Sequence, residues 1–373
     1  MKPRLGILGT GGIANLHMKQ IRQYDRFDVV ACCDLMGDRC ESFCGQYGIS
    51  RHYTDYRRML ENENLDALMV LTPNCAHMEP TIAALEAGVH VFCEKPMALT
   101  VGQAEAMVRA EKASKATLMI GQHWRFFNAS QYIRRVVMAG DLGEIYYARI
   151  WHLRQMGVPW WGQFHRKDFS GGGALIDNGA HIIDLALWLM GSPQPVEVMG
   201  STSSRVATRV DGERPNQNPA KAHEFDVEDF ASGFVRMSNG ATLSLVSSWA
   251  INLGPKINKG LEICGDMGGA RFDPLQIFSA RHGALVDVTP QMDEQAEPHG
   301  LATEHFRRVI LGEEEPIIST EEPLNALRII HAVYRSAAEG GAVALRPSRS
   351  SDDGARTPQE SPSADSSPVA EPV

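Results

Sequence analysis

Short apolar runs separated by stretches of helical length organise the first part of the chain. The runs predict strands at residues 4–8, 28–33, 67–71, 89–93 and 117–120, and their hydrophobic character is typical of strands buried on both faces of a parallel sheet. The stretches between them predict helices, one of which begins at Thr100 with Gln103 in capping-box spacing. The alternation predicts a doubly wound α/β domain.

The pattern changes after Gly121. A helix is predicted at residues 129–138, and β-rich runs follow at residues 144–152, 227–236, 242–251, 260–264 and 269–272. Turn signals at Gly240 and Gly268 separate neighbouring runs, which favours a largely antiparallel sheet. Two late helices, at residues 300–311 and 323–339, close this second, α+β domain, and one of them can pack back on the first.

The chain therefore divides into a first domain at residues 1–122, a second at residues 123–345 and a tail at residues 346–373. Two domains agree with a length of 373 residues. The tail is rich in Ser, Pro and Asp and nearly free of large apolar residues, which is typical of a disordered segment.

Composition restricts the class of protein. The chain is 43% hydrophobic, as globular proteins are, and its net charge of −9 argues against a nucleic-acid partner, which requires clustered lysine and arginine. Its seven cysteines lack the paired spacing of a zinc site and the density of a disulfide framework. No apolar run is long enough to cross a bilayer, and the glycine-broken amino terminus is not a secretory signal. We expect a soluble cytoplasmic protein with reduced thiols.

A glycine-rich turn follows the first predicted strand and opens a helix. It has the pattern G-x-G-x-x-A, formed by Gly9, Thr10, Gly11, Gly12, Ile13 and Ala14. The first glycine permits a tight turn, the second lets backbone amides approach a pyrophosphate, and the alanine keeps helix and strand close. Asp34 ends the next strand about 20 residues further on, at the distance where a carboxylate meets a ribose hydroxyl. This combination predicts a Rossmann dinucleotide site.

Asp34 also bears on which dinucleotide binds. A carboxylate at this position would repel a 2′-phosphate, and the next residue is Leu35 rather than a cation. NAD is favoured over NADP, although Arg39 lies a helical turn further on and leaves NADP possible.

Polar residues follow two other predicted strands. Thr72, Pro73, Asn74 and His77 come after one, and the sequence Glu94-Lys95-Pro96 comes after another. In parallel sheets the ligand crevice lies outside the carboxyl ends of the strands, so contact with the cofactor is expected. Pro96 restricts Lys95 to extended conformations and so presents its ammonium group to this crevice. The alternatives are a polar turn capping the next helix, for His77, and a solvated charge, for an isolated Glu-Lys pair.

A second chemical stretch lies at residues 170–191. A glycine triplet, residues 171–173, provides a flexible entry to a mostly buried helix that ends before Gly191. Asp177 and His181 are four apart and would share a face of that helix, with Asp184 near the same side. A histidine beside a carboxylate suits general-base chemistry. The alternatives are polar groups that only satisfy one another, or a metal site, which we do not favour because no further ligand has recognisable spacing.

Taken in this order, these motifs resemble the glucose-fructose oxidoreductase / inositol dehydrogenase / rhizopine-catabolism (Gfo/Idh/MocA) family of NAD(P)-dependent oxidoreductases. The resemblance covers residues 4–340, and its specific part is the E-K-P tripeptide joined to the D-x-x-x-H helix. It implies a Rossmann domain followed by a domain with an open antiparallel sheet, whose exposed face forms a dimer or tetramer interface.

The resemblance also implies that Lys95, Asp177 and His181 are the catalytic trio. His181 would take the substrate hydroxyl proton, Lys95 would stabilise the developing alkoxide, and Asp177 would contact a substrate hydroxyl or steady the histidine. The sequence departs from the family pattern near residues 123–125 and 160–163. We expect the substrate to be read by side chains from these and neighbouring segments, namely Arg125, His152, Arg154, Trp161 and His165. For the pair Trp160-Trp161, core packing between domains is an equal alternative.

The sequence thus predicts an NAD-dependent oxidoreductase that acts on a secondary alcohol or ketone of a sugar, inositol or related polyol, with no metal and no membrane partner. Two alternatives stay open. One is a glycoside-cleaving enzyme that uses tightly held NAD for transient oxidation, and the other is an NAD-binding regulator without turnover. Retention of both Lys95 and His181 argues against the regulator.

Overall fold

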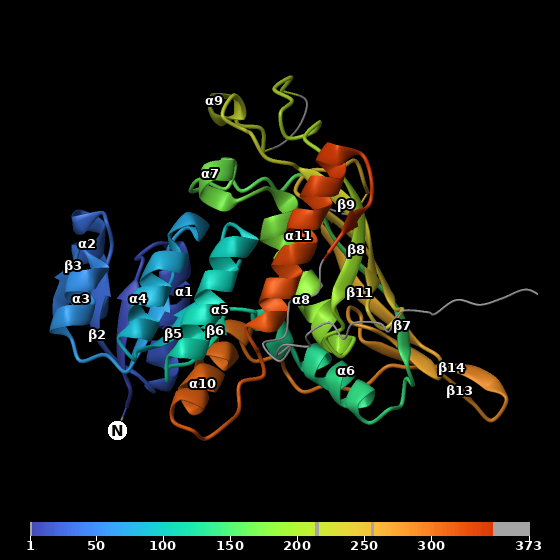
Figure 1. Cartoon of the computed structure of the whole chain (residues 1–373), viewed down its shortest axis with the longest axis horizontal. Helices are drawn as coiled ribbons and strands as arrows, with labels where there is room; N and C mark the ends of the chain where they lie inside the picture. Colours follow the sequence, from blue (N-terminus) through green and yellow to red (C-terminus); the bar gives the residue numbers. More distant parts are fainter. Residues whose placement is uncertain (1, 213–215, 255–256, 346–373) are drawn as a thin grey trace, which may run out of the picture.

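The protein has two β-sheets, each covered by helices, which lie next to each other in space (Figure 1). The computed structural model describes residues 2–212, 216–254 and 257–345. The tail predicted at residues 346–373 lies outside the described residues.

The first sheet has six parallel strands in the order β3-β2-β1-β4-β5-β6, as the predicted doubly wound domain requires. Its strands are β1 (Arg4–Leu8), β2 (Asp28–Cys33), β3 (Arg51–Tyr53), β4 (Ala67–Val70), β5 (His90–Cys93) and β6 (Leu118–Ile120). Five of them match the apolar runs of the sequence, and β3 was not predicted because it is short and its residues are largely exposed.

Helices cover both faces of this sheet. They are α1 (Gly12–Tyr24), α2 (Gly37–Tyr47), α3 (Tyr56–Asn62), α4 (Met78–Glu86) and α5 (Val101–Ala113), with 3₁₀ turns at Asn74–Ala76 and His123–Phe126. The predicted cap of α5 is present, because the Thr100 hydroxyl accepts a hydrogen bond from the Gln103 amide at 3.3 Å.

The second sheet has nine strands in the order β14-β13-β12-β11-β7-β10-β9-β8-β15. They are β7 (Ile145–Arg154), β8 (Pro195–Ser203), β9 (Phe230–Met237), β10 (Thr242–Ser248), β11 (Ile257–Gly265), β12 (Gly268–Arg271), β13 (Gln276–Arg281), β14 (Ala284–Val288) and β15 (Val343–Ala344). The pairing is antiparallel except between β7 and β10, so the predicted fold class is confirmed. The sequence prediction missed β8, β13, β14 and β15.

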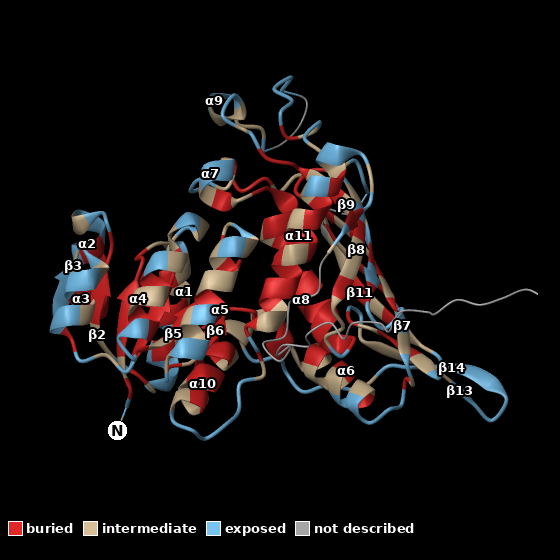
Figure 2. Cartoon of the chain, in the orientation of Figure 1, coloured by how far each residue is buried: buried red, intermediate tan, exposed pale blue. Residues whose placement is uncertain are grey.

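Helices cover the side of this sheet that faces the first domain (Figure 1). The helices of this domain are α6 (Asn128–Met138), α7 (Lys167–Ser170), α8 (Ala180–Leu189), α9 (Pro219–Ala222), α10 (Pro298–Ile310) and α11 (Glu321–Glu339). Every residue of α8 is buried, whereas α11 has exposed residues near its carboxyl end (Figure 2). Among the described helices, none combines the length and the hydropathy that crossing a bilayer would require.

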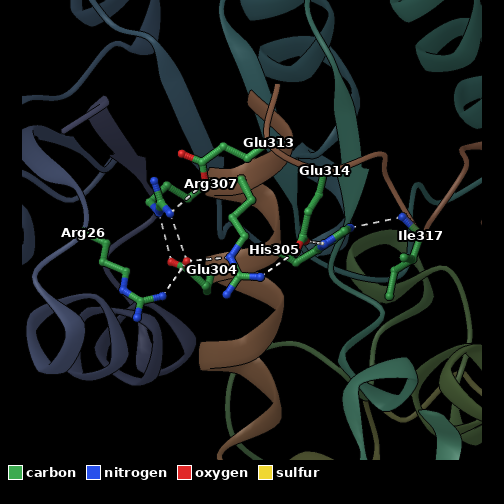
Figure 3. A network of polar contacts seen from close by, with 8 residues as sticks. Arg26, Glu304, His305, Arg307, Glu313, Glu314 and Ile317 are labelled. Atoms are coloured by element: carbon green, nitrogen blue, oxygen red, sulfur yellow. Dashed lines mark hydrogen bonds and ion pairs between the residues drawn. The ribbon is translucent and has the colours of Figure 1, made fainter. Parts of the chain in front are cut away.

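Helix α10 returns to the first domain, as one late helix was expected to do. Ala302 and Phe306 share a core with residues of β1, α1 and α2. On the polar side of α10, Glu304 forms ion pairs with Arg26, Arg307 and Arg308 (Figure 3). Physically, α10 therefore belongs to the first core, although its residues lie within the predicted second domain.

Candidate active site

A cavity of about 890 Å³ lies at the carboxyl ends of β1, β2, β4 and β5. This is the edge at which parallel sheets bind ligands, and the volume is in the range of cofactor sites. Residues after each of these four strands line it, and so do residues 161–164 from the second domain. The cavity therefore has walls from both domains.

The glycine-rich turn forms one wall. Gly9 has φ of 91°, and a β-carbon there would lie 2.6 Å from the Leu71 carbonyl oxygen, so only glycine fits. At Gly11 and Gly12 a β-carbon would meet no atom within 4 Å. The start of α1 is thus open on the cavity side, where its free amides and dipole suit a pyrophosphate. Ala14 is buried against the sheet, as the pattern requires.

Asp34 follows β2 and is 4% exposed. It accepts hydrogen bonds from the Thr10 amide and hydroxyl at 2.8 and 2.9 Å, and from Arg39 at 2.7 and 2.8 Å. Burial raises the pKa of the carboxyl group, but the bonds from Arg39 and its other donors outweigh burial and lower it. Arg39 is therefore neutralised by Asp34 and also lines the cavity.

Thr72, Pro73 and Asn74 line the cavity as expected. His77 does not, and the prediction that it contacts the cofactor is wrong. It is buried, and its ring nitrogens lie 2.8 Å from the Pro96 carbonyl oxygen and 3.0 Å from that of Thr72. The imidazole joins the loop after β4 to the loop after β5 and so positions their side chains.

Glu94 also lines the cavity. One carboxylate oxygen is 2.8 Å from His17 Nε2, and the other accepts a hydrogen bond from the Lys95 amide at 3.1 Å. Burial raises its pKa, but the bond to His17 outweighs burial and brings the pKa to about 2. Glu94 is thus an anion in the cavity wall next to Lys95.

Lys95 follows directly, in a cis peptide bond to Pro96. Its ammonium group donates to Asp177 Oδ1 at 3.0 Å, and Asp177 Oδ2 accepts a hydrogen bond from the Trp249 indole, also at 3.0 Å. Burial raises the Asp177 pKa, while the Lys95 charge outweighs burial and lowers it. The structure thus brings together two of the three predicted catalytic residues as an ion pair across the domain boundary.

His181, the third, is buried on α8 beside them. Its ring lies parallel to that of Trp124, with centroids 5.8 Å apart, and edge-on to His123 at 4.7 Å. Burial first, and then the Lys95 charge, lower the His181 pKa well below its usual value. This lowered pKa favours the neutral imidazole, and its Nδ1 has no hydrogen-bond partner among the described residues.

The predicted pairing of Asp177 with His181 is wrong. Residues Leu175–Gly179 form a π-helical turn ahead of α8, which is wider than the α-helix assumed from the sequence. Asp177 consequently uses its carboxylate on Lys95 and Trp249 instead. Turns of this kind are frequent at functional sites.

The glycine triplet ahead of this turn leads into α8 and also allows close packing against Glu228. Gly171 has φ of 84°, and a β-carbon at Gly173 would lie 1.8 Å from the Glu228 carbonyl oxygen. The Glu228 carboxylate accepts hydrogen bonds from the Gly173 and Leu175 amides at 2.8 and 2.9 Å. It thereby caps the turn that carries Asp177, and sequence reasoning gave no sign of this.

Arg125 does not read the substrate, contrary to prediction. It is fully buried and pairs with Asp184 at 2.6 and 2.8 Å and with Glu322 at 2.6 Å. This arrangement also removes Asp184 from any metal set with Asp177 and His181. No group of three suitable side chains within the described residues could hold a metal ion.

His165 is also buried and is not among the residues that line the cavity, so the structure does not support the substrate role predicted for it. Its ring packs beside Trp160, and its Nε2 lies 3.5 Å from Glu224. Trp161, in contrast, is 67% exposed and lines the cavity. The two neighbouring tryptophans thus divide between packing and the cavity wall.

His152 and Arg154 lie on the face of β7 that looks toward α8, with Lys259 opposite His152 on β11. Burial and the Arg154 charge lower the His152 pKa to about 4. Sequence reasoning missed Lys259 because the predicted strand began at residue 260. Alternation with the buried Leu261 and Ile263 would have placed it on this inner face.

Comparison with known proteins agrees with these features. The family model for the oxidoreductase family with an NAD-binding Rossmann fold matches residues 3–122, and the model for the GFO/IDH/MocA C-terminal domain matches residues 130–271. D-glucoside 3-dehydrogenase of Escherichia coli (strain K12) is 32% identical over 344 residues, which cover 92% of this chain and 97% of that protein.

Solved structures give the same answer. Aldose-aldose oxidoreductase from Caulobacter crescentus, complexed with glycerol, matches with a TM-score of 0.76 and 27% identity over 92% of this chain and all (100%) of that chain. Levoglucosan dehydrogenase in complex with NADH and levoglucosan shares the fold, with a TM-score of 0.81 at 22% identity over 93% of this chain and 100% of that one. Fold and site thus define an oxidoreductase with an NAD-binding Rossmann domain. The chain belongs to the Gfo/Idh/MocA family.

Proposed function

We propose that this protein is an NAD-dependent dehydrogenase that oxidises a secondary alcohol of a sugar, inositol or related polyol, or reduces the corresponding ketone. The observation that carries the proposal is the Lys95 ammonium group, which lines the dinucleotide cavity and is held at 3.0 Å by Asp177 beside a neutral histidine. A cation and a neutral base next to a nicotinamide site suit alcohol oxidation.

The cofactor site is proposed from the residues that line the cavity. The open glycine turn would hold the pyrophosphate and Asp34 the adenosine ribose, with Thr72, Pro73, Asn74 and Glu94 on the nicotinamide side. NAD, when bound, supplies the hydride acceptor. Because Asp34 already neutralises Arg39, that arginine gives little attraction to a 2′-phosphate, which supports NAD over NADP.

The catalytic roles follow from charge and protonation. His181 is neutral and would take the hydroxyl proton, and Lys95 would stabilise the negative charge that develops on the substrate oxygen. Asp177 would keep the ammonium group charged and oriented. The relatives support this substrate class, since they include a D-glucoside 3-dehydrogenase and a myo-inositol 2-dehydrogenase from Thermotoga maritima.

The test is a panel of free sugars, methyl glucosides and inositols incubated with NAD, in which NADH formation is followed by absorbance. We expect stoichiometric NADH from at least one of these alcohols. Cleavage of a glycoside without net NADH would instead indicate the transient-oxidation enzyme. NAD binding by calorimetry with no conversion of any compound would indicate a regulator and overturn the proposal.

We also propose that the chain forms a homodimer or homotetramer through the outer face of the second sheet. Met199 and Phe234 pair across β8 and β9 on this face and are 60% and 45% exposed. Light scattering should give a mass above one chain, and Phe234→Glu should lower it. A monomeric wild-type protein at micromolar concentration would contradict this proposal.

A cytoplasmic location is a further proposal. All seven cysteines are free thiols, and six of them are not exposed, which is consistent with a reducing compartment. Detection of the protein in a periplasmic or secreted fraction would contradict it.

A further inference from the structure

Two cations project from the sheet toward the site. In the antiparallel pairing of β7 with β11, Lys259 lies opposite His152, and Arg154 follows two residues later on the same face. The Lys259 ammonium group lies 5.2 Å from the centre of the Trp124 ring, and that ring also contacts His181 at 5.8 Å. Lys259 and His181, the proposed base, thus both contact the Trp124 ring.

Arg154 lies on the other side of His152. Its stem packs on Gly157, where a β-carbon would come within 2.5 Å of Arg154 Cδ. Its charge lowers the pKa values of both Asp177 and His152. Both cations are partly buried, which makes their charges felt over a longer distance than in water.

Neither cation has a carboxylate partner among the described residues. Among the described residues, the Arg154 side chain donates a hydrogen bond to the Gly157 carbonyl oxygen, and at 3.4 Å this bond is long. Arginines on the opposite face of the same sheet are different, since Arg149 and Arg271 both pair with Glu262. Within the described residues, the inner face therefore holds two cations that form no ion pair of their own.

The charges around the site do not balance. Three cations, Lys95, Arg154 and Lys259, lie around the site. Asp177 pairs with Lys95 and also feels the Arg154 charge, while Glu94 lines the cofactor cavity and is engaged by His17. Burial and these cations keep His152 and His181 neutral. An excess of positive charge in a partly buried site is costly unless a ligand brings a negative group.

We propose that the substrate carries an anionic group, a carboxylate or a phosphate, which Arg154 and Lys259 bind while Lys95 and His181 act on a hydroxyl of the same molecule. Arginine forms paired hydrogen bonds with either anion, and lysine adds a point charge. This inference rests on the proposed dehydrogenase function and narrows its substrate class to sugar acids or phosphorylated polyols.

The experiment compares matched substrates with the full-length protein and NAD. The pairs are D-glucose with D-glucuronate, D-glucose with D-glucose 6-phosphate, and myo-inositol with myo-inositol 1-phosphate. We expect kcat/KM for one anionic member to exceed that of its neutral partner about 10- to 100-fold, the effect of a charge-assisted hydrogen bond. The two anion types distinguish a carboxylate from a phosphate site, and added salt should reduce the preference.

Variants test whether Lys259 and Arg154 cause the preference for anionic substrates. Lys259→Met and Arg154→Met should each lower the anionic-to-neutral ratio of kcat/KM at least about tenfold, mainly through KM. Lys259→Arg should keep most of the preference for the anionic substrate. Arg149→Met is the matched control, since it removes a cation from the opposite face of the same strand and should leave the ratio unchanged. Retained NAD binding shows that each variant has folded.

Each outcome decides one of the two proposals. If neutral compounds give NADH with kcat/KM equal to or above that of their anionic partners, the anion site is overturned while the dehydrogenase stands. The anion site is also overturned if the preference exists but the Lys259 and Arg154 variants both keep it. If no compound of either kind gives NADH, the dehydrogenase proposal itself fails.

Discussion

The ammonium group of Lys95 donates hydrogen bonds to both the carboxylate and the backbone carbonyl of Asp177, at 3.0 and 3.2 Å. Lys95 lies just beyond β5 of the first domain, and Asp177 lies in the π-helical turn of the second. The ion pair is mostly buried, with side chains 16% and 15% exposed. It therefore fixes a charge at the place where the two domains meet the cofactor cavity.

Replacing Lys95 by Met should abolish catalysis while NAD binding survives. Without the ammonium group, developing negative charge on the substrate oxygen loses its stabilisation, and we expect kcat to fall about 10²- to 10⁴-fold. Stopped-flow NADH formation and calorimetric NAD binding measure the two effects separately. Lys112→Met is the control, because Lys112 lies on the exposed side of α5. Near-normal turnover by the Lys95 variant would remove its assigned role.

Replacing Asp34 by Ala should shift cofactor preference toward NADP. The change removes the carboxylate that would bind the ribose and releases Arg39 to meet a 2′-phosphate. The ratio of kcat/KM for NAD to that for NADP should fall at least about tenfold. Asp38→Ala removes a nearby exposed carboxylate and should leave the ratio unchanged. An unaltered ratio in the Asp34 variant would show that it does not select the cofactor.

Much of this site could be predicted because its signals are local. A glycine turn, an acid at the end of the next strand and E-K-P each lie within a few residues of the strand that positions them. The predictions that failed concerned residues whose roles depend on contacts between segments distant in the sequence. Arg125 is a core cation because Asp184 and Glu322 approach it, and Glu228 caps the turn after residue 173 from more than 50 residues away. No periodicity in the sequence reports such contacts.

Local helix geometry also limited what the sequence could predict about the site. A spacing of four residues places Asp177 and His181 side by side only if the segment is α-helical, and a π-helical turn changes which groups meet. The bounds of the strands mattered equally, since the strand predicted at residues 260–264 begins three residues after the start of β11 and so left out Lys259.

Arg125→Lys should destabilise the protein rather than alter substrate recognition. Lysine cannot reproduce the paired hydrogen bonds to Asp184 and the separate bond to Glu322, so buried carboxylates lose partners. We expect the free energy of unfolding to fall by about 3 kcal/mol, measured by urea denaturation. Arg135→Lys, at an exposed position of α6, should change it by less than about 0.5 kcal/mol. A normal urea midpoint with a raised substrate KM would restore Arg125 to the substrate site.

Buried neutral histidines should make the protein less stable in mild acid. The His152 pKa is about 4 in the folded protein and near 6.5 when unfolded, so between these values the unfolded chain binds a proton that the native state does not. Stability is therefore lost as pH falls from about 6.5 toward 4. Between pH 7 and pH 5, His152→Gln should lose about 2 kcal/mol less than wild type in urea titrations. His52→Gln, at an exposed position, is the control, and equal losses in all three proteins would contradict the assignment.

The glycine triplet offers a test of whether close packing holds the catalytic turn. A β-carbon at Gly173 would lie 1.8 Å from the Glu228 carbonyl oxygen, so Gly173→Ala must push the π-helical turn away from its cap. We expect a loss of about 1 to 3 kcal/mol in stability and about a 100-fold loss in kcat/KM, because Asp177 moves with the turn. Thermal unfolding and NADH formation measure the two losses.

Gly102→Ala is the matched control for this substitution. Gly102 is exposed within α5, and a β-carbon there meets no atom within 4 Å. The same chemical change should raise stability by about 0.5 to 1 kcal/mol, since alanine favours the helix, and leave kcat/KM unchanged. Opposite signs from one substitution at two glycines would assign the effect to the approach of Glu228 rather than to backbone flexibility. Two stabilised proteins with full activity would show that the turn tolerates displacement from its cap.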